Sequence, residues 1–203
     1  MIVTAIKQQV RQKGRYSVFV EGKYSFSLSD SALLESKLVI GQELTGEEVK
    51  RFKQLSGDDK LQSMALRYAA MRPRSTWEME QYLKRKKAAP LLHQQILSKL
   101  SNLNLLDDRS FAESWVASRR LLKPVSYRRL QAELRAKHVP DEVITEVLAG
   151  DETDERTTLR DLVARKRKQS KYQDQTKLMQ YLARQGFSYD DIKSVLSEET
   201  EEA

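Results

Sequence analysis

Cysteine is absent from the 203-residue chain, which excludes a disulfide framework, a thiolate zinc site and a cysteine nucleophile. Glycine is scarce, and its seven occurrences are scattered singly, so no glycine-rich loop is present to cradle phosphates. No apolar run is long enough to span a bilayer, and the N-terminus lacks the short apolar core of a signal peptide. We therefore expect a soluble, cytoplasmic protein with no membrane partner and no cofactor.

The proportions of apolar and charged residues disfavour one large core. Hydrophobic residues make up 39% of the chain and charged residues 32%. A single compact domain of this length buries a large share of its surface, whereas small modules that touch only their neighbours need fewer apolar residues. The composition therefore favours an elongated string of small modules.

One helical unit is written three times between Leu61 and Leu196. The copies align without gaps on a leucine that is followed thirteen and fourteen residues later by an apolar pair. Another apolar residue stands four positions before each leucine, and a Ser or Asp that can cap a helix stands eight positions before it. The period of 48 to 51 residues predicts an array of three tandem three-helix repeats in a mainly α-helical fold. The three leucines are Leu83, Leu134 and Leu182; the pairs are Ile96/Leu97, Val147/Leu148 and Val195/Leu196; the preceding residues are Met79, Leu130 and Leu178; and the caps are Ser75, Ser126 and Asp174.

The first two copies differ in length near their first helix. Tyr68 and Trp115 occupy equivalent positions 47 residues apart, but Leu83 and Leu134 are 51 residues apart. Four residues make about one helical turn, so the second copy is expected to have a longer first helix or connector. A looser joint is expected between the second and third copies, where glycine and acidic residues occupy 150–153.

The segment before the repeats is predicted to form a small β-rich cap. Residues 16–20 and 24–28 alternate apolar and polar side chains across a Glu21-Gly22 turn, which is a hairpin pattern. Residues 2–10 are a candidate third strand. The cap thus contains a hairpin or a three-stranded meander.

Two short helices are expected to complete this cap. Ser29 can begin a helix through Lys37, and Thr45 with Glu48 has the spacing of a capping box that opens a helix through Leu55. The polar run 56–59 then separates the cap from the first repeat. The predicted domains are the cap at 1–57, the repeats at 58–106, 107–150 and 151–197, and an acidic tail at 198–203 within the frayed end SEETEEA.

Positive charge is concentrated in the first repeat. Residues 61–106 carry eight basic and two acidic side chains, whereas the other segments are nearly balanced. Basic residues at helix ends and connectors can reach phosphates or an acidic protein surface, although about half of them are expected only to solvate a helix face. The candidate binding residues are Arg72, Arg74, Lys84, Arg85, Lys86, Arg119, Arg120, Arg128 and Arg129.

Three stretches of the repeats carry a recognisable pattern: ALRYAAMRPRSTWEMEQYLKRK, the more specific LLDDRSFAESWVASR from Leu105 to Arg119, and RRLQAELRAKHV. These stretches resemble the RecX family, which regulates the bacterial recombinase RecA. The resemblance covers roughly residues 61–196, and residues 1–57 lie outside its motifs.

This resemblance implies a protein that acts on RecA filaments assembled on single-stranded DNA. It implies inhibition of the filament's ATP hydrolysis and strand exchange, through blocked extension or destabilisation, together with some direct binding to DNA. We expect such a protein to act as a monomer. The basic candidates above are then expected to contact RecA or DNA.

Two non-enzymatic alternatives stay open. Three-helix units with basic helices also resemble helix-turn-helix modules, which would make the chain a DNA-binding array that acts without RecA. Matched surface positions differ between copies, which disfavours the reading of one repeated base pattern. A scaffold without a nucleic-acid role would instead bind protein with little salt dependence. The differing positions are Lys84-Arg85-Lys86, Arg135-Ala136-Lys137 and Ala183-Arg184-Gln185.

No catalytic or metal site is expected. His93 and His138 lie 45 residues apart, and neither has a second histidine or a cysteine three or four residues later, which disfavours zinc. Three pairs of carboxylates stand at predicted helix starts, where the helix dipole stabilises negative charge. They are Asp107-Asp108, Asp141-Glu142 and Asp190-Asp191. The sequence leaves open only a two-carboxylate nuclease site assembled from distant residues.

Overall fold

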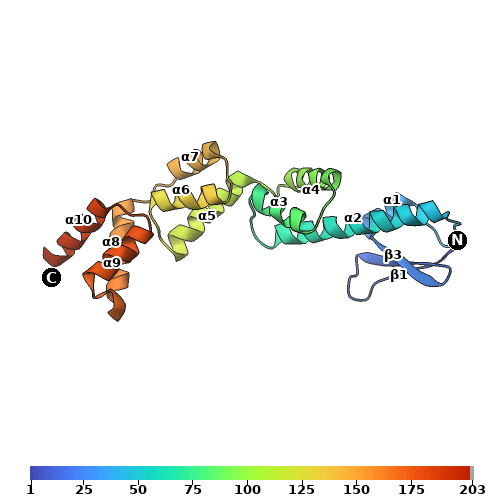
Figure 1. The fold of residues 1–203 in the computed structure, drawn as a ribbon, viewed down its shortest axis with the longest axis horizontal. Coiled ribbons are helices and arrows are strands. Elements are labelled where there is room, and N and C mark those ends of the chain that lie inside the picture. The colour runs from blue at the N-terminus through green and yellow to red at the C-terminus, as the bar shows by residue number, and fades with distance from the viewer. Residues whose placement is uncertain (202–203) are drawn as a thin grey trace. The chain divides into compact units, whose positions relative to one another are not determined.

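The computed structural model describes residues 1–201 and the side chains of residues 1–198. In this part of the chain, ten α-helices follow a three-stranded sheet, so the predicted mainly helical fold with a small N-terminal sheet is confirmed (Figure 1). The chain divides into two compact units. The first comprises residues 1–72 and 80–102, and the second comprises residues 73–79 and those from Leu103 onward.

The first unit begins with the predicted meander of β1 (Val3–Gln8), β2 (Arg15–Val20) and β3 (Lys23–Ser29). The strands pair antiparallel in the order β1-β2-β3. Glu21 and Gly22 both have positive φ, at 51° and 73°, as a primed hairpin turn requires. Both the hairpin and the third strand are therefore confirmed.

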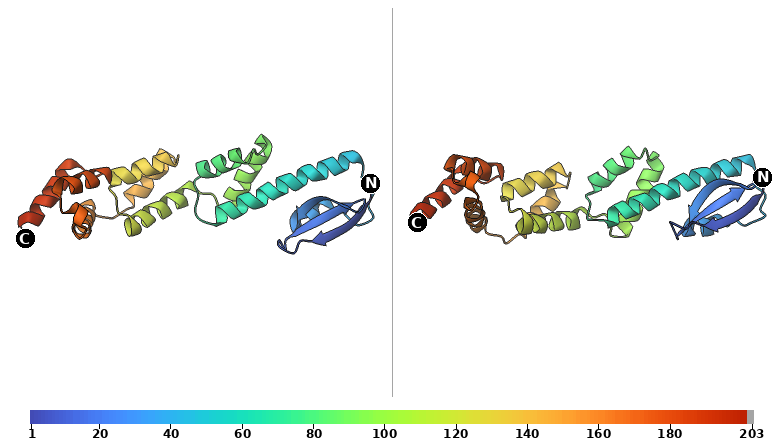
Figure 2. Two further views of the ribbon diagram at one scale, coloured as in Figure 1. Left: turned by 60° about the horizontal axis from the view of Figure 1, so that its bottom comes forward. Right: turned by 90° about the horizontal axis from the view of Figure 1, so that it is seen from below.

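Two helices complete the cap, α1 (Asp30–Ser36) and α2 (Gly46–Ala70). The predicted capping box is present, since Thr45 Oγ1 accepts from the Glu48 amide at 3.1 Å and Glu48 Oε2 accepts from the Thr45 amide at 2.7 Å. The sheet lies along the N-terminal half of α2, as Figure 2 shows. Phe26 of β3 stacks on Phe52 of α2 with ring centroids 5.4 Å apart, so one face of the sheet is buried against this helix.

The expected end of this second helix at Leu55 is wrong, because α2 runs without a break through residues 56–59. Their polar side chains bind the sheet instead of ending the helix. Ser56 Oγ donates to the Ser27 carbonyl at 2.6 Å, and Asp59 accepts from the Ser29 amide at 3.0 Å. The predicted limit between the cap and the first repeat, at residues 57 and 58, thus falls inside α2. The division of the chain into these domains remains a prediction.

The three repeats contain the expected helices, except that the C-terminal half of α2 serves as the first helix of the first repeat. The anchoring leucines and the apolar residues four positions before them are fully buried. The side chain of each predicted cap accepts a hydrogen bond from the backbone amide three residues later. The donor–acceptor distances are 3.2 Å for Ser75, 3.1 Å for Ser126 and 3.1 Å for Asp174. The remaining helices are α3 (Thr76–Arg85), α4 (Pro90–Asn102), α5 (Asp108–Leu122), α6 (Tyr127–Ala136), α7 (Asp141–Ala149), α8 (Glu155–Arg167), α9 (Gln175–Arg184) and α10 (Tyr189–Glu201), with a short 3₁₀ helix at Ser170–Tyr172.

The extra turn of the second repeat was predicted to lie in its first helix or in the connector, and it lies in the helix. Helix α5 extends from Trp115 to Leu122, seven residues further, whereas α2 extends from Tyr68 to Ala70, only two. At the other end of the chain, α10 reaches Glu201, so the helix continues into the tail that was expected to fray. Residues 202 and 203 of that tail lie outside the described residues.

The second and third repeats meet closely at Gly186, within the second unit. Gly186 has a φ of +95°, and a Cβ on it would lie 2.3 Å from Ser126 Oγ and 2.8 Å from Arg129 Cβ. Beside this contact, the Ser126 amide donates to the Gln185 carbonyl at 3.1 Å. The linker at 150–153 is also tied to the second repeat, because Asp151 accepts from Arg120. The joint that was expected to be loose is therefore closely packed.

Replacing Gly186 with alanine should destabilise this joint. The added Cβ requires both an unfavourable positive φ and a shift of the α6 start, so Gly186→Ala should lower the free energy of unfolding by at least about 1 kcal/mol. Urea unfolding followed by circular dichroism measures the change. Gly150→Ala is the matched control, since its φ is −82° and its Cβ would meet nothing closer than 3.6 Å. Equal unfolding midpoints for the two variants would contradict the proposed close approach.

Candidate functional site

Three basic candidates of the first repeat, Lys84, Arg85 and Lys86, lie at the C-terminal end of α3, where the helix dipole stabilises positive charge. Lys84 is 3.9 Å from Glu80, and Lys86 lies 5.7 Å from the ring centroid of Tyr82. Arg85 is exposed and makes no ion pair with any residue whose side chain is described. Arg72, at the end of α2, is also exposed. This end of α3 thus presents mostly accessible positive charge.

Arg74 is placed differently, because its side chain is largely buried in the second unit. Its Nη1 lies 4.0 Å from Glu78, whose carboxylate also accepts from Lys137 Nζ at 2.8 Å. Trp77 next to Glu78 stacks on His138, with ring centroids 4.6 Å apart. Arg74 therefore belongs to a packed contact between the start of α3 and the end of α6.

A single carboxylate, that of Glu133 on α6, brings two predicted arginines together. Its Oε2 accepts from Arg119 Nε at 2.8 Å and from Trp115 Nε1 at 3.0 Å, and its Oε1 accepts from Arg129 Nε at 3.2 Å. The Arg119 guanidinium also lies over the Trp115 ring, 5.0 Å from its centroid. We call Trp115, Arg119, Arg129 and Glu133 the Glu133 cluster.

The Glu133 cluster keeps a net positive charge that solvent can reach. Side-chain exposure is 15% for Glu133, 27% for Arg119 and 49% for Arg129. Arg128, which precedes Arg129 in α6, is exposed and has no ion pair within residues 1–198. Guanidinium groups held in this way can bind phosphates or carboxylates.

Arg120 is not available for a partner, because it is used to hold the linker after α7. It donates from Nε and Nη2 to Asp151 Oδ2 at 2.8 and 2.6 Å, and from Nη1 to the Val125 carbonyl at 2.7 Å. Burial alone would raise the pKa of Asp151, but hydrogen bonds from Arg120 and Thr153 lower it below its ordinary value of 3.8. Arg120 thus has a structural role.

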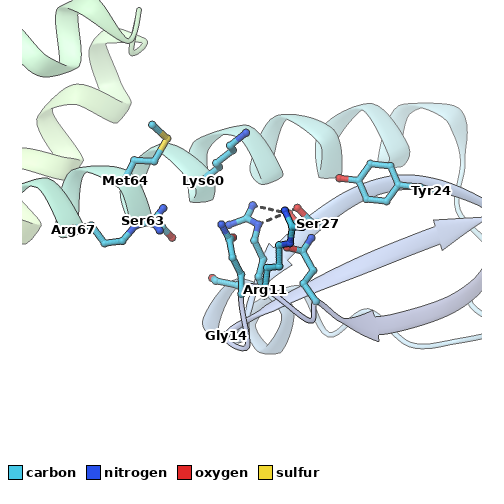
Figure 3. A pocket seen from close by; sticks show the side chains of 12 residues that line it. Arg11, Gly14, Tyr24, Ser27, Lys60, Ser63, Met64 and Arg67 are labelled. Atoms are coloured by element: carbon cyan, nitrogen blue, oxygen red, sulfur yellow. Dashed lines mark hydrogen bonds between the residues drawn. The ribbon is translucent and has the colours of Figure 1, made fainter.

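Two features, one in each unit, were missed in the sequence. Glu133 was not a candidate, although its spacing of four residues from Arg129 on one helix was a signal for a pair. A basic cleft in the first unit, lined in part by Arg11, Lys60 and Arg67, was missed as well (Figure 3). Lys60 and Arg67 are seven residues apart and share a helix face, but this face exists only because α2 continues past Leu55.

Asp151→Asn should reveal the role of the Arg120 contact through its pH dependence. Because the pKa of Asp151 is lowered in the folded state, the contact stabilises the fold above pH 3.8 and is lost as pH falls through the folded value. We expect the variant to lose roughly 1–3 kcal/mol of unfolding free energy at neutral pH.

Urea unfolding at neutral pH and near pH 3 measures the difference between this variant and the unmodified chain, which should shrink at the lower pH. Asp161→Asn, at an exposed carboxylate of α8, is the control and should change little at either pH. A loss for Asp151→Asn that is the same at both pH values would refute the ion-pair explanation.

No helix in the described part of the chain combines the length and the apolar character needed to cross a membrane. Three family models match the chain. The N-terminal domain of regulatory protein RecX matches residues 1–45, the second three-helix domain of RecX matches 107–148, and the third matches 154–196. The match at 1–45 corrects the expectation that the first 57 residues lie outside the resemblance.

Similar proteins extend these matches. The chain is 32% identical over 203 residues to regulatory protein RecX of Bacillus licheniformis, covering 97% of this chain and 76% of the relative. Two Lactobacillus relatives with the same name, from L. johnsonii and L. gasseri, are 32% and 30% identical. The aligned part covers 72% and 76% of this chain but only 54% and 56% of those relatives, so the match spans little more than half of their length.

Solved structures show the same fold. A crystal structure titled regulatory protein RecX has a TM-score of 0.69 at 24% identity, covering 97% of this chain and 98% of the other. The structure of RecX from Lactobacillus salivarius has a TM-score of 0.57 at 25% identity, covering 70% of this chain and 96% of the other. The family models and the Bacillus relative show that the chain belongs to the RecX family of regulatory proteins.

Proposed function

We propose that this chain binds RecA filaments on single-stranded DNA and limits their extension, ATP hydrolysis and strand exchange during DNA repair and recombination. Membership of a family of regulatory proteins and the resemblance of the repeats to RecA regulators support the proposal. The observation that carries it is the Glu133 cluster, in which one carboxylate holds two partly exposed arginines.

The geometry of the cluster suits a polyanionic partner. Arg119 binds Glu133 through Nε, and its two Nη groups make no hydrogen bond within the described residues. Arg129 also uses Nε for Glu133, and its Nη1 is 3.3 Å from the Arg184 carbonyl. Both guanidinium groups are thereby held in place before a partner arrives, which lowers the entropy lost on binding. A filament of protein and DNA offers phosphates and carboxylates that these donors fit.

Removing both arginines should weaken inhibition of RecA. In a titration of RecA ATP hydrolysis on single-stranded DNA, Arg119→Ala with Arg129→Ala should raise the half-inhibitory concentration roughly tenfold, the scale of one or two charge-assisted hydrogen bonds. A double lysine variant keeps the charge but loses the planar fork, so it should recover only part of the inhibition.

Arg165→Ala with Lys193→Ala removes two exposed charges from the third repeat and is the matched control. Equal losses in the control and the cluster variant would reject the cluster as the contact. If the unmodified chain left RecA unaffected while binding bare DNA tightly, the protein would instead be a DNA-binding helical-repeat protein that acts without RecA. Urea unfolding of each variant separates lost binding from lost folding.

A further inference from the structure

An open cleft of about 640 Å³ lies between the β1–β2 loop and the middle of α2 in the first unit. Figure 3 shows Lys60, Met64 and Arg67 on the helix side, with Arg11 and Gly14 on the loop side. Four of its described lining residues are basic and none is acidic. The cleft therefore has the charge of an anion-binding site, although residues 1–60 as a whole are nearly balanced in charge.

The helix side of the cleft is a regular row of side chains. Lys60, Ser63, Met64 and Arg67 have helical spacing and share one face of α2. Lys60 and Arg67 are two turns apart, which separates their Cα atoms by about 10 Å along the helix axis. Two cations at this spacing suit an extended polyanion better than a single small anion.

The loop side is fixed by backbone hydrogen bonds. The Gln9 amide donates to the Arg15 carbonyl at 2.8 Å, and the Arg15 amide donates to the Gln12 carbonyl at 2.9 Å. The Asp30 amide donates to the Gly14 carbonyl at 3.2 Å. Because the loop is held at both ends, the position of Arg11 relative to α2 is defined in the absence of a ligand.

The cationic groups of the cleft divide into one that is neutralised and three that are not. Arg15 is 7% exposed, and its Nη1 pairs with Asp59 at 2.9 Å, so its charge is compensated. Arg11, Lys60 and Arg67 are exposed and form no ion pair within the described side chains. These three residues give the cleft its uncompensated positive charge.

An aromatic ring completes the lining. Tyr24 of β3 is 59% exposed, and it meets Phe19 edge-on with ring centroids 6.2 Å apart. An exposed ring beside a line of cations is the combination by which proteins hold single strands, since phosphates meet the charges and a base stacks on the ring.

We propose that this cleft binds the backbone of single-stranded DNA, with Arg11, Lys60 and Arg67 contacting phosphates and Tyr24 stacking on a base. The choice of DNA over another single strand rests on the proposed function, whereas the cleft itself is separate from the Glu133 cluster. The N-terminal cap then has a binding role of its own.

Fluorescence anisotropy with a labelled oligothymidylate over a range of salt concentrations tests the site. Lys60→Ala with Arg67→Ala should raise the dissociation constant about tenfold at low salt and reduce the slope of log affinity against log salt by about 1.4, or about 0.7 for each lost phosphate contact. Tyr24→Ala should weaken binding several-fold, whereas Tyr24→Phe should not.

Lys50→Ala with Lys53→Ala is the matched control, because it removes two exposed charges from the same helix outside the cleft. The proposal predicts that this control keeps the affinity and slope of the unmodified chain. Equal effects of the two double variants, or no effect of either, would overturn the cleft as a site.

The two proposals fail in different assays. If the unmodified chain inhibits RecA but the cleft variant binds the oligonucleotide normally, only the cleft proposal is wrong. If the cleft variant loses the oligonucleotide but the unmodified chain leaves RecA unaffected, only the proposed function is wrong.

Discussion

The buried pair between Arg15 and Asp59 determines how the first unit is built. It joins the start of β2 to the middle of α2, and the neighbouring Ser27–Ser56 hydrogen bonds extend the same contact. Removing one partner of such a pair leaves a buried charge, which typically costs about 3–5 kcal/mol. The pair also lets a polar stretch remain helical, so that one helix serves both the cap and the first repeat. Both walls of the basic cleft depend on this attachment.

The arginines of the second repeat show that two residues of the same type can have different roles in the structure. Arg119 and Arg120 are adjacent in α5, yet they point to different partners. Arg120 forms three hydrogen bonds that close the linker after α7, whereas Arg119 joins Arg129 on a carboxylate near the surface. Adjacent residues of a helix face different directions, so one faces the packed joint and the other faces outward. A basic run in the sequence can therefore contain a residue used within the fold beside one that stays accessible to a partner.

The predictable part of the fold is the part set by local pattern. Leu83, Leu134 and Leu182 were recognisable as core because each recurs in the same helical register, and Ser126 as a cap because its bond reaches only three residues ahead. The continuity of α2 was not predictable in this way, because the partners of Asp59 lie 30 or more residues away in the sequence. In the candidate site, the basic residues could be named from the sequence. The pairing of Arg120 with Asp151 could not, because it is a tertiary contact between residues far apart in the chain. The cleft was missed for the same reason.

Gly186 has a mechanical consequence for the second unit. Its missing side chain lets the backbone after α9 rest against the start of α6, where the Ser126 amide and the Arg129 side chain bind the two preceding carbonyls. A load applied to the third repeat is therefore carried directly into the helix that bears Arg129 and Glu133. The contact that joins the second and third repeats therefore depends on a residue with no side chain.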